Sequence, residues 1–122
     1  MTTLTRAELG ALGERLAAEH LTGLGLRIVE CNWRCRYGEL DIVAAEDSSA
    51  TIVFVEVKTR TTTVYGHPAE AVTAAKMGRL RRLAGLWLAG QETRWAQVRI
   101  DVVGVQFTGD RTPELSHLRG VC

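Results

Sequence analysis

Hydrophobic positions near the N-terminus repeat at helical spacing. The apolar side of this stretch contains Leu9, Leu12, Gly13, Leu16, Ala17 and Leu24. Thr5 and Glu8 precede the run at the spacing of a capping box, in which each side chain accepts a hydrogen bond from the other residue's backbone N–H. The pattern therefore predicts a helix that begins after Thr5, and Gly23 and Gly25 predict its end.

The rest of the chain alternates between strand and helix patterns. Strands are expected over 26–34, 38–45, 51–60 and 98–105, a helix over 73–89, and residues 115–118 could form a short fifth strand. A polar turn over 46–50 joins two of these strands, so they should pair antiparallel. The strand from Thr51 to Arg60 begins apolar on both faces, which is typical of a central strand that is covered on both sides. The two helices would supply that cover, which predicts an α/β sandwich forming one domain over residues 1–122.

Charged residues end the apolar part of this central strand. Glu56 and Lys58 point to one face, because side chains alternate along a strand. Folding the hairpin about Ser48 places Asp41 opposite or next to Glu56. Two neighbouring carboxylates repel each other, and a divalent cation between them removes the repulsion. Hard oxygen ligands of this kind suit Mg²⁺ or Mn²⁺, and Lys58 could orient an attacking water or hold a phosphate. The competing interpretation is an ion-pair network at a sheet edge.

The net charge of +1 does not by itself indicate a nucleic-acid partner, but the charge is unevenly distributed. Residues 1–47 hold five basic and eight acidic side chains, whereas residues 48–91 hold six and two. Lys76 is singled out because it falls between Leu83 and Trp87 on the apolar side of its helix, so we expect its ammonium group to reach a phosphate or the acids. Further expected phosphate contacts are Arg34, Arg36, Arg60 and Arg79. The alternative for the basic residues on the helix is that they form only a solvated helix face.

The chain shows no export signal and no apolar stretch long enough to span a bilayer, so a cytoplasmic location without membrane association is expected. Cys31 and Cys35 lie too far apart in a strand for a disulfide, which favours reduced thiols.

Asp101 is expected to pair with Arg99 or a site lysine, in a structural role. The three tryptophans, Trp33, Trp87 and Trp95, are expected in the core.

Five sequence strings carry a family resemblance: LGERLAAEHL, NWRCRYGELDIVA, FVEVKTR, AVTAAK and RIDVVGV. Together they resemble the YraN-like family of small uncharacterised bacterial proteins (uncharacterised protein family 0102), within the PD-(D/E)xK superfamily of restriction endonucleases and Holliday junction resolvases. The resemblance covers residues 9–120. It implies a restriction-endonuclease-like three-layer α/β/α core with a mixed central sheet and the order αβββαβ.

The resemblance also implies roles for individual residues. Asp41, Glu56 and Lys58 match the catalytic set, with Asp41 and Glu56 as metal ligands. Glu14 is a further candidate, because an acid on the first helix approaches the metal in resolvases of this fold. Leu40 stands where the superfamily pattern has proline, at a position that varies widely. Glu39 shares the face of Asp41 and either supports the site or is a surface charge.

These observations predict a Mg²⁺- or Mn²⁺-dependent nuclease-like domain that binds and cleaves DNA, with structured or branched DNA favoured. The alternatives are a non-catalytic nucleic-acid-binding module and a protein-interaction module that retain the nuclease fold. The oligomeric state is left open between a monomer and a homodimer.

Overall fold

The structure is a computed structural model that describes residues 4–61, 72–107, 109 and 112–121. Its elements are α1 (Arg6–Gly23), β1 (Arg27–Cys35), β2 (Gly38–Glu46), β3 (Thr51–Arg60), α2 (Ala74–Ala89), β4 (Gln97–Gln106) and β5 (Glu114–Leu118), with one 3₁₀ turn, Asp47–Ser49, between β2 and β3. These elements match the predicted order αβββαβ and add the short fifth strand. The sequence also predicts a polar loop over 61–66, and apart from its first residue this loop lies outside the described residues.

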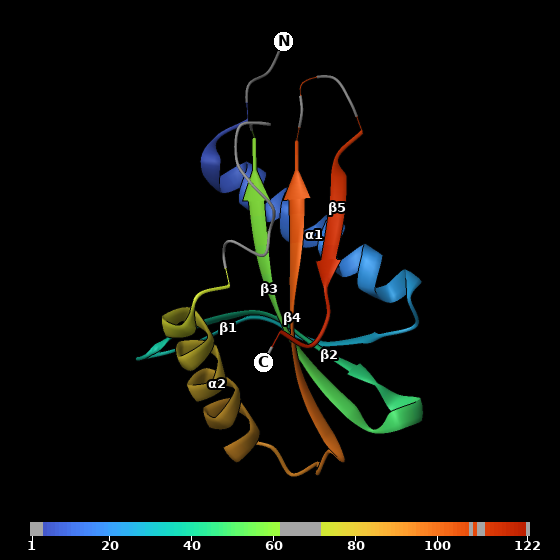
Figure 1. The fold of residues 1–122 in the computed structure, drawn as a ribbon, viewed down its shortest axis with the longest axis vertical. Coiled ribbons are helices and arrows are strands. Elements are labelled where there is room, and N and C mark those ends of the chain that lie inside the picture. Colours follow the sequence, from blue (N-terminus) through green and yellow to red (C-terminus); the bar gives the residue numbers. More distant parts are fainter. Residues whose placement is uncertain (1–3, 62–71, 108, 110–111, 122) are drawn as a thin grey trace.

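The five strands form one mixed sheet in the order β1-β2-β3-β4-β5 (Figure 1). β3 is the middle strand, and it pairs antiparallel with β2 and parallel with β4. The parallel pair needs a crossover connection, which α2 provides. The predicted α/β class, the mixed sheet and the central position of the third strand are therefore confirmed.

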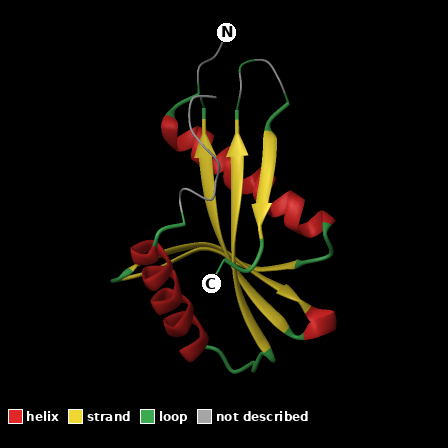
Figure 2. Cartoon of the chain, viewed as in Figure 1, coloured by secondary structure: helices red, strands yellow, loops and turns green. Residues whose placement is uncertain are grey.

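The two helices cover opposite faces of the sheet (Figure 2). On one face, Ala17 and Leu21 of α1 pack on residues that include Val53, Val55 and Val103. On the other face, five buried residues of α2 pack against the sheet; they are Met77, Leu80, Leu83, Ala84 and Trp87. Each large apolar side chain buried in this way contributes about 1.5–3 kcal/mol. The predicted three-layer α/β/α arrangement is confirmed, and it is consistent with a restriction-endonuclease-like fold.

The tryptophans belong to the apolar layer on the α2 side, as expected. Trp87 is buried, and its ring meets Phe54 edge-on with 5.6 Å between the ring centroids. Its Nε1 donates to Glu30 Oε1 at 2.9 Å, so the polar end of the ring is satisfied. Trp33 and Trp95 are partly buried against the same core.

The N-terminal helix begins as its sequence predicts. The Thr5 backbone N–H donates to Glu8 Oε1 at 2.9 Å, and the Glu8 N–H donates to Thr5 Oγ1 at 3.1 Å, which completes the capping box. The prediction that Leu24 belongs to the apolar side was wrong, because this side chain is 55% exposed. α1 ends at Gly23, so Leu24 leaves the helical phase, and Leu21 takes the buried position instead.

Glycine at position 13 allows α1 to approach the central strand. Gly13 is buried, and a Cβ added to it would overlap the Thr59 side chain on β3. This close approach brings the following residue, Glu14, toward the same part of the sheet.

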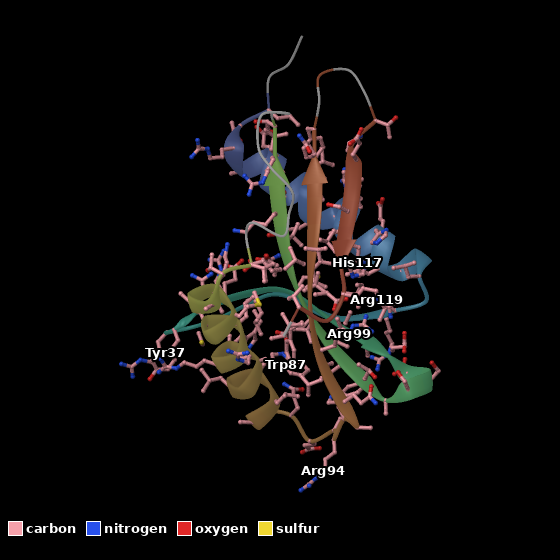
Figure 3. The ribbon with its side chains drawn as sticks, in the orientation of Figure 1. Tyr37, Trp87, Arg94, Arg99, His117 and Arg119 are labelled. Atoms are coloured by element: carbon pink, nitrogen blue, oxygen red, sulfur yellow. The ribbon has the colours of Figure 1, made fainter. Side chains whose placement is uncertain are left out.

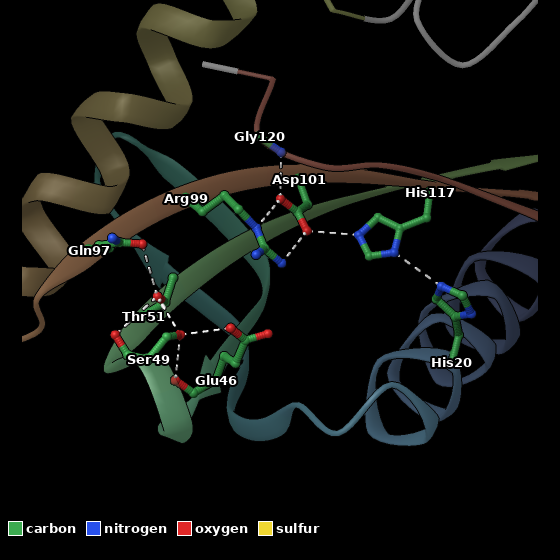
Figure 4. A network of polar contacts seen from close by, with 9 residues as sticks. All are labelled: His20, Glu46, Ser49, Thr51, Gln97, Arg99, Asp101, His117 and Gly120. Atoms are coloured by element: carbon green, nitrogen blue, oxygen red, sulfur yellow. Dashed lines mark hydrogen bonds and ion pairs between the residues drawn. The ribbon is translucent and has the colours of Figure 1, made fainter.

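A buried carboxylate joins β4, β5 and α1 (Figure 4). Asp101 is fully buried, and it accepts hydrogen bonds from Nε and Nη2 of Arg99 and from the Gly120 backbone N–H. His117 Nε2 lies 2.8 Å from Asp101 Oδ2, and its Nδ1 lies 3.1 Å from His20 Nε2. Burial of a charge is costly unless it is paired, so this network accounts for the buried aspartate. The expected structural pairing of Asp101 with Arg99 is confirmed.

Two further expectations bear on the whole chain. Cys31 and Cys35 carry free thiols, as expected, while Cys122 lies outside the described residues. Across the described part of the chain, no helix combines the length and the apolar character that crossing a bilayer requires.

The close approach of α1 gives a stability prediction. Gly13→Ala should lower the free energy of unfolding by about 1–3 kcal/mol, because its methyl group must displace Thr59. Gly10→Ala is the matched control: the space around Gly10 is open, so this change should stabilise the helix by up to about 1 kcal/mol. Denaturant unfolding measures both effects. Equal effects of the two changes would contradict the close approach, and Thr59→Ala should partly rescue Gly13→Ala.

Candidate active site

Asp41 lies where the β2–β3 ladder ends. The recorded pairs run from Glu46↔Thr51 to Ile42↔Val55, and one more step in this register would set Asp41 opposite Glu56. The Val57 backbone N–H instead donates to Asp41 Oδ2 at 2.8 Å. The strand pairs confirm the predicted hairpin register. Beyond the last pair, the Asp41 side chain accepts a hydrogen bond from a β3 backbone N–H, as a backbone carbonyl of β2 would do in a continued ladder.

The surroundings of the Asp41 carboxyl group disfavour its ionised form. Burial is the main cause that raises the pKa of Asp41 to about 7. The hydrogen bond from the Val57 N–H acts in the opposite direction, and the carboxyl groups of Glu56 and Glu14 add to the rise. A side chain that is ordinarily ionised well below neutral pH is thus still half-protonated near pH 7 in the metal-free protein.

Glu56 brings a second carboxyl group with an unsatisfied oxygen. Its Oε2 is buried and has no hydrogen-bond partner among the described residues. The nearest recorded cation is Arg79, whose Nη2 lies 4.0 Å from this oxygen, too far for a hydrogen bond. The Arg79 side chain is 56% exposed, whereas that of Glu56 is 13% exposed. An ion pair of this length with a solvated partner leaves the buried oxygen poorly compensated.

Two lysines face the acids from β3 and from the first turn of α2. Thr73 caps α2 through a hydrogen bond from the Lys76 backbone N–H to Thr73 Oγ1, at 3.2 Å. Burial lowers the pKa of Lys76 to about 8; neighbouring Lys58 and Arg79 add to the lowering, and Glu56 opposes it. The structure therefore brings Lys76 to Lys58 and Glu56, as the helical phase predicts.

Two more acids approach Asp41 from the α1 side. Among the described residues, one ligand oxygen each from Glu14, Glu39 and Asp41 lie within 4.8 Å of one another. Burial raises the pKa of Glu14, and the charge of Glu39 adds to this rise, while a hydrogen bond from Asn32 opposes it. Glu56 is not a member of this three-acid group. Asp41 is thus the acid common to both sides, with Glu56 on β3 and with Glu14 and Glu39 toward α1.

Asn32 is a site residue that the sequence did not reveal. With its amide nitrogen turned toward the acids, it donates to Glu14 Oε2 at 3.0 Å and to Glu39 Oε1 at 3.3 Å. Its backbone has φ 54°, a left-handed conformation that asparagine tolerates better than most residues. Together with Glu14 and Asp41 it lines a hollow of about 330 Å³ between α1 and the sheet. No sequence pattern marks this role, because it depends on the left-handed backbone of Asn32 within β1.

The arginines expected to contact phosphate are placed differently from one another. Arg34 Nε lies 2.7 Å from Glu39 Oε2, so Arg34 partners an acid of the cluster. Arg36 is exposed beside Tyr37 in the β1–β2 turn, and Arg60 is half-buried at the end of β3. Arg79 is the expected arginine that lies against Glu56.

The donor set fits a small divalent cation. Carboxylate oxygens are the ligands that Mg²⁺ and Mn²⁺ prefer. The orphaned Glu56 Oε2 and the raised pKa of Asp41 are both features that a bound cation would relieve. Lys58 and Lys76 add positive charge beside these acids, so the site can attract a phosphate as well as a cation.

Comparison with known proteins places this chain in a family. Residues 13–105, which include Glu14, Asp41, Glu56, Lys58 and Lys76, match the family model described as uncharacterised protein family UPF0102. The chain belongs to this family. The YraN-like resemblance is thereby confirmed.

Mycobacterial relatives match nearly the whole chain. A UPF0102 protein of Mycobacterium avium (strain 104) is 62% identical over 120 residues, covering 98% of this chain and 94% of the relative. The UPF0102 protein of Mycobacterium ulcerans (strain Agy99) is 63% identical over 121 residues, covering 99% of both chains. That of Mycobacterium tuberculosis (strain ATCC 25177 / H37Ra) is 60% identical over 124 residues, covering 99% of this chain and 97% of the relative.

The raised pKa of Asp41 predicts a pH dependence of stability without metal. The folded-state pKa of about 7 lies above the unfolded value of about 3.9, so the unfolded chain releases this proton first. The contribution of Asp41 to stability is therefore full below about pH 4 and declines as pH rises to about 7, by at most about 1.4 kcal/mol per unit. Asp41→Asn removes this titration while keeping an acceptor for the Val57 N–H.

Thermal unfolding in chelator from pH 4 to pH 8 measures this difference. Asp41→Asn should gain stability relative to the parent as pH rises, and the gain should level off above about pH 7. A difference between the two proteins that stays constant with pH would contradict the assignment.

Proposed function

We propose that this chain is a metal-dependent nuclease that hydrolyses phosphodiester bonds in DNA, with structured or branched DNA as the favoured substrate. The observation that carries the proposal is the meeting of Asp41 and Glu56 beside Lys58 and Lys76, with a buried Glu56 Oε2 that has no hydrogen-bond partner among the described residues. A protein fold does not keep facing acids and facing lysines together without cost. A cation and a phosphate, bound together, would neutralise both.

Asp41 and Glu56 would hold a Mg²⁺ or Mn²⁺ ion, with Glu14 approaching from α1. When bound, such an ion makes water a better nucleophile and offsets negative charge on the phosphate. Asp41 would give up the proton that it keeps in the metal-free protein, because only the carboxylate binds a cation well.

The lysines would act on the phosphate and on the attacking water. Lys58 lies on the same strand as Glu56, two residues further on, and would orient the water or offset charge on the phosphate. Lys76 would hold the phosphate from the first turn of α2, where free backbone N–H groups also favour an anion. In the hydrolysis, the water oxygen forms a new bond to phosphorus, one ester P–O bond breaks, and the leaving oxygen takes up a proton.

A module that only binds nucleic acid is the second candidate, and the acids argue against it. A binding surface needs basic side chains for the phosphates. Asp41 has Glu14 and Glu39 on one side and Glu56 on the other, and these acids would repel the same backbone unless a cation lies between them. A pure ion-pair network is disfavoured too, because within the described part of the chain the 4.0 Å contact of Arg79 leaves Glu56 Oε2 without a hydrogen bond.

A cleavage assay tests the proposal. The protein is incubated in Mn²⁺ with single-stranded, duplex, flap and four-way DNA, and products are resolved by size. We expect cleavage of at least one structured substrate, its loss in Asp41→Asn and Glu56→Gln, and a rate about 10²–10³-fold lower in Lys58→Ala, the scale of one lost transition-state contact. Binding without cleavage would instead support the module, and cleavage that persists in Asp41→Asn would disprove the assigned site.

Lys76 should contribute to DNA binding through its charge. Lys76→Met keeps most of the side-chain volume, so the melting temperature should stay near that of the parent, while DNA affinity falls. The slope of log K against log [salt] should decrease by about one, because one phosphate contact is lost. The control is Arg94→Met, an exposed cation beyond the far end of α2 (Figure 3). Equal losses in the two variants would show that Lys76 contributes only to a diffuse positive field and makes no specific phosphate contact.

A further inference from the structure

The turn between β1 and β2 presents an aromatic ring to solvent. Tyr37 is 43% exposed and lies at the edge of the molecule, beyond α2 (Figure 3). The guanidinium carbon of Arg82, from α2, lies 3.9 Å from the ring centroid, and that of Arg36, from the same turn, lies 5.2 Å away. Both distances are within the range of cation–π contacts. The result is an exposed aromatic ring between two cations.

The neighbouring backbone fixes this ring relative to α2. Gly38 follows Tyr37 with φ 142°, a conformation that side-chain-bearing residues rarely adopt, so the turn depends on glycine there. A Cβ at Gly38 would lie 3.4 Å from Leu83 Cδ1, which shows that the turn sits directly on the buried side of α2. The Tyr37 ring is therefore held by a packed turn and by Arg82, yet a large part of its surface stays open.

A line of basic side chains on α2 connects this ring to the acids. Lys76 interacts with Lys58 and Glu56, and Arg79 lies 4.0 Å from Glu56. Arg82 comes one turn later and covers Tyr37. At about 1.5 Å per residue, Lys76 and Arg82 are separated by about 9 Å along the helix axis, which corresponds to roughly three base steps of about 3.4 Å.

We infer that Tyr37, flanked by Arg36 and Arg82, is a stacking platform for an unpaired base on the DNA strand that enters the active site. Aromatic side chains beside a basic groove are how proteins bind single strands irrespective of sequence, because every base has a π-face. Arg36 has the looser of the two contacts and an exposed side chain, so it can move to cover the base or its phosphate. This inference rests on the proposed function, and it specifies the substrate as DNA with an unpaired segment beside the cleaved phosphate.

A purely structural role for Tyr37 does not explain the exposure of its ring or the two arginines beside it. If the ring served only to attach the turn to α2, burial against Leu83 would stabilise it more than exposure does. The two arginines, both close to the ring, also repel each other, and a partner carrying negative phosphates would relieve this repulsion.

The test compares duplexes that differ only in an overhang. Binding is measured in Ca²⁺, so that a divalent cation neutralises the acids while Mg²⁺ and Mn²⁺ are absent, to a blunt duplex and to the same duplex with 5′ or 3′ overhangs of one, two, four and six thymidines. We expect the parent to bind the longer overhangs about tenfold or more tightly than the blunt end, the scale of one base–aromatic stack, with the gain complete by about four nucleotides. Tyr37→Phe should keep this gain. Tyr37→Leu should lose it while binding the blunt duplex as the parent does.

A fluorescent base in the overhang gives a second readout that does not depend on any variant folding well. 2-Aminopurine three nucleotides from the duplex end should be quenched when the parent binds, as expected for a stacked base. An overhang gain that survives in Tyr37→Leu, or a parent that shows neither gain nor quenching while binding blunt duplex, would overturn the inference and leave the proposed function standing. A parent that binds none of these DNAs would overturn both.

Discussion

The hydrogen bond from the Val57 backbone N–H to the Asp41 carboxyl group is the contact on which the candidate active site depends. It holds a side chain at the point where the ladder between β2 and β3 stops, next to Glu56. Burial and neighbouring acids make the charged form of Asp41 unfavourable, and this hydrogen bond is the recorded contact that favours it. In the metal-free protein, Asp41 and its neighbouring acids therefore lack the metal ion that would stabilise their charged forms.

The fold supplies the other groups from both faces of the sheet. Gly13 lets α1 approach β3 closely, which brings Glu14 to the Asp41 side of the sheet. The crossover that makes β3 and β4 parallel also starts α2 beside the end of the apolar part of β3, so Lys76 meets Lys58 there. Acids thus come from α1 and the β1–β2–β3 side, and cations come mainly from β3 and α2.

The fold and the centre of the site could be predicted from the sequence because they depend on local patterns. A short polar turn fixes the hairpin register and with it the neighbours Asp41 and Glu56, while helical phase alone puts Lys76 on the sheet side of α2. Asn32 could not be predicted, because its left-handed backbone arises from an irregular strand. Leu24 was assigned wrongly because the pattern continued past the end of the helix. Contacts between distant elements, such as an α2 arginine over the hairpin tyrosine, leave no mark on periodicity.

Calorimetric titration of the metal-free protein with Mn²⁺ tests the central claim most directly. Because the pKa of Asp41 is about 7, binding at pH 6 should release close to one proton, measured as heat that varies with the ionisation enthalpy of the buffer. The same titration at pH 8.5 should show tighter binding and little proton release. Asp41→Asn should abolish binding at both pH values. Mn²⁺ binding that is unchanged in Asp41→Asn, or that is independent of pH, would contradict the account of this site.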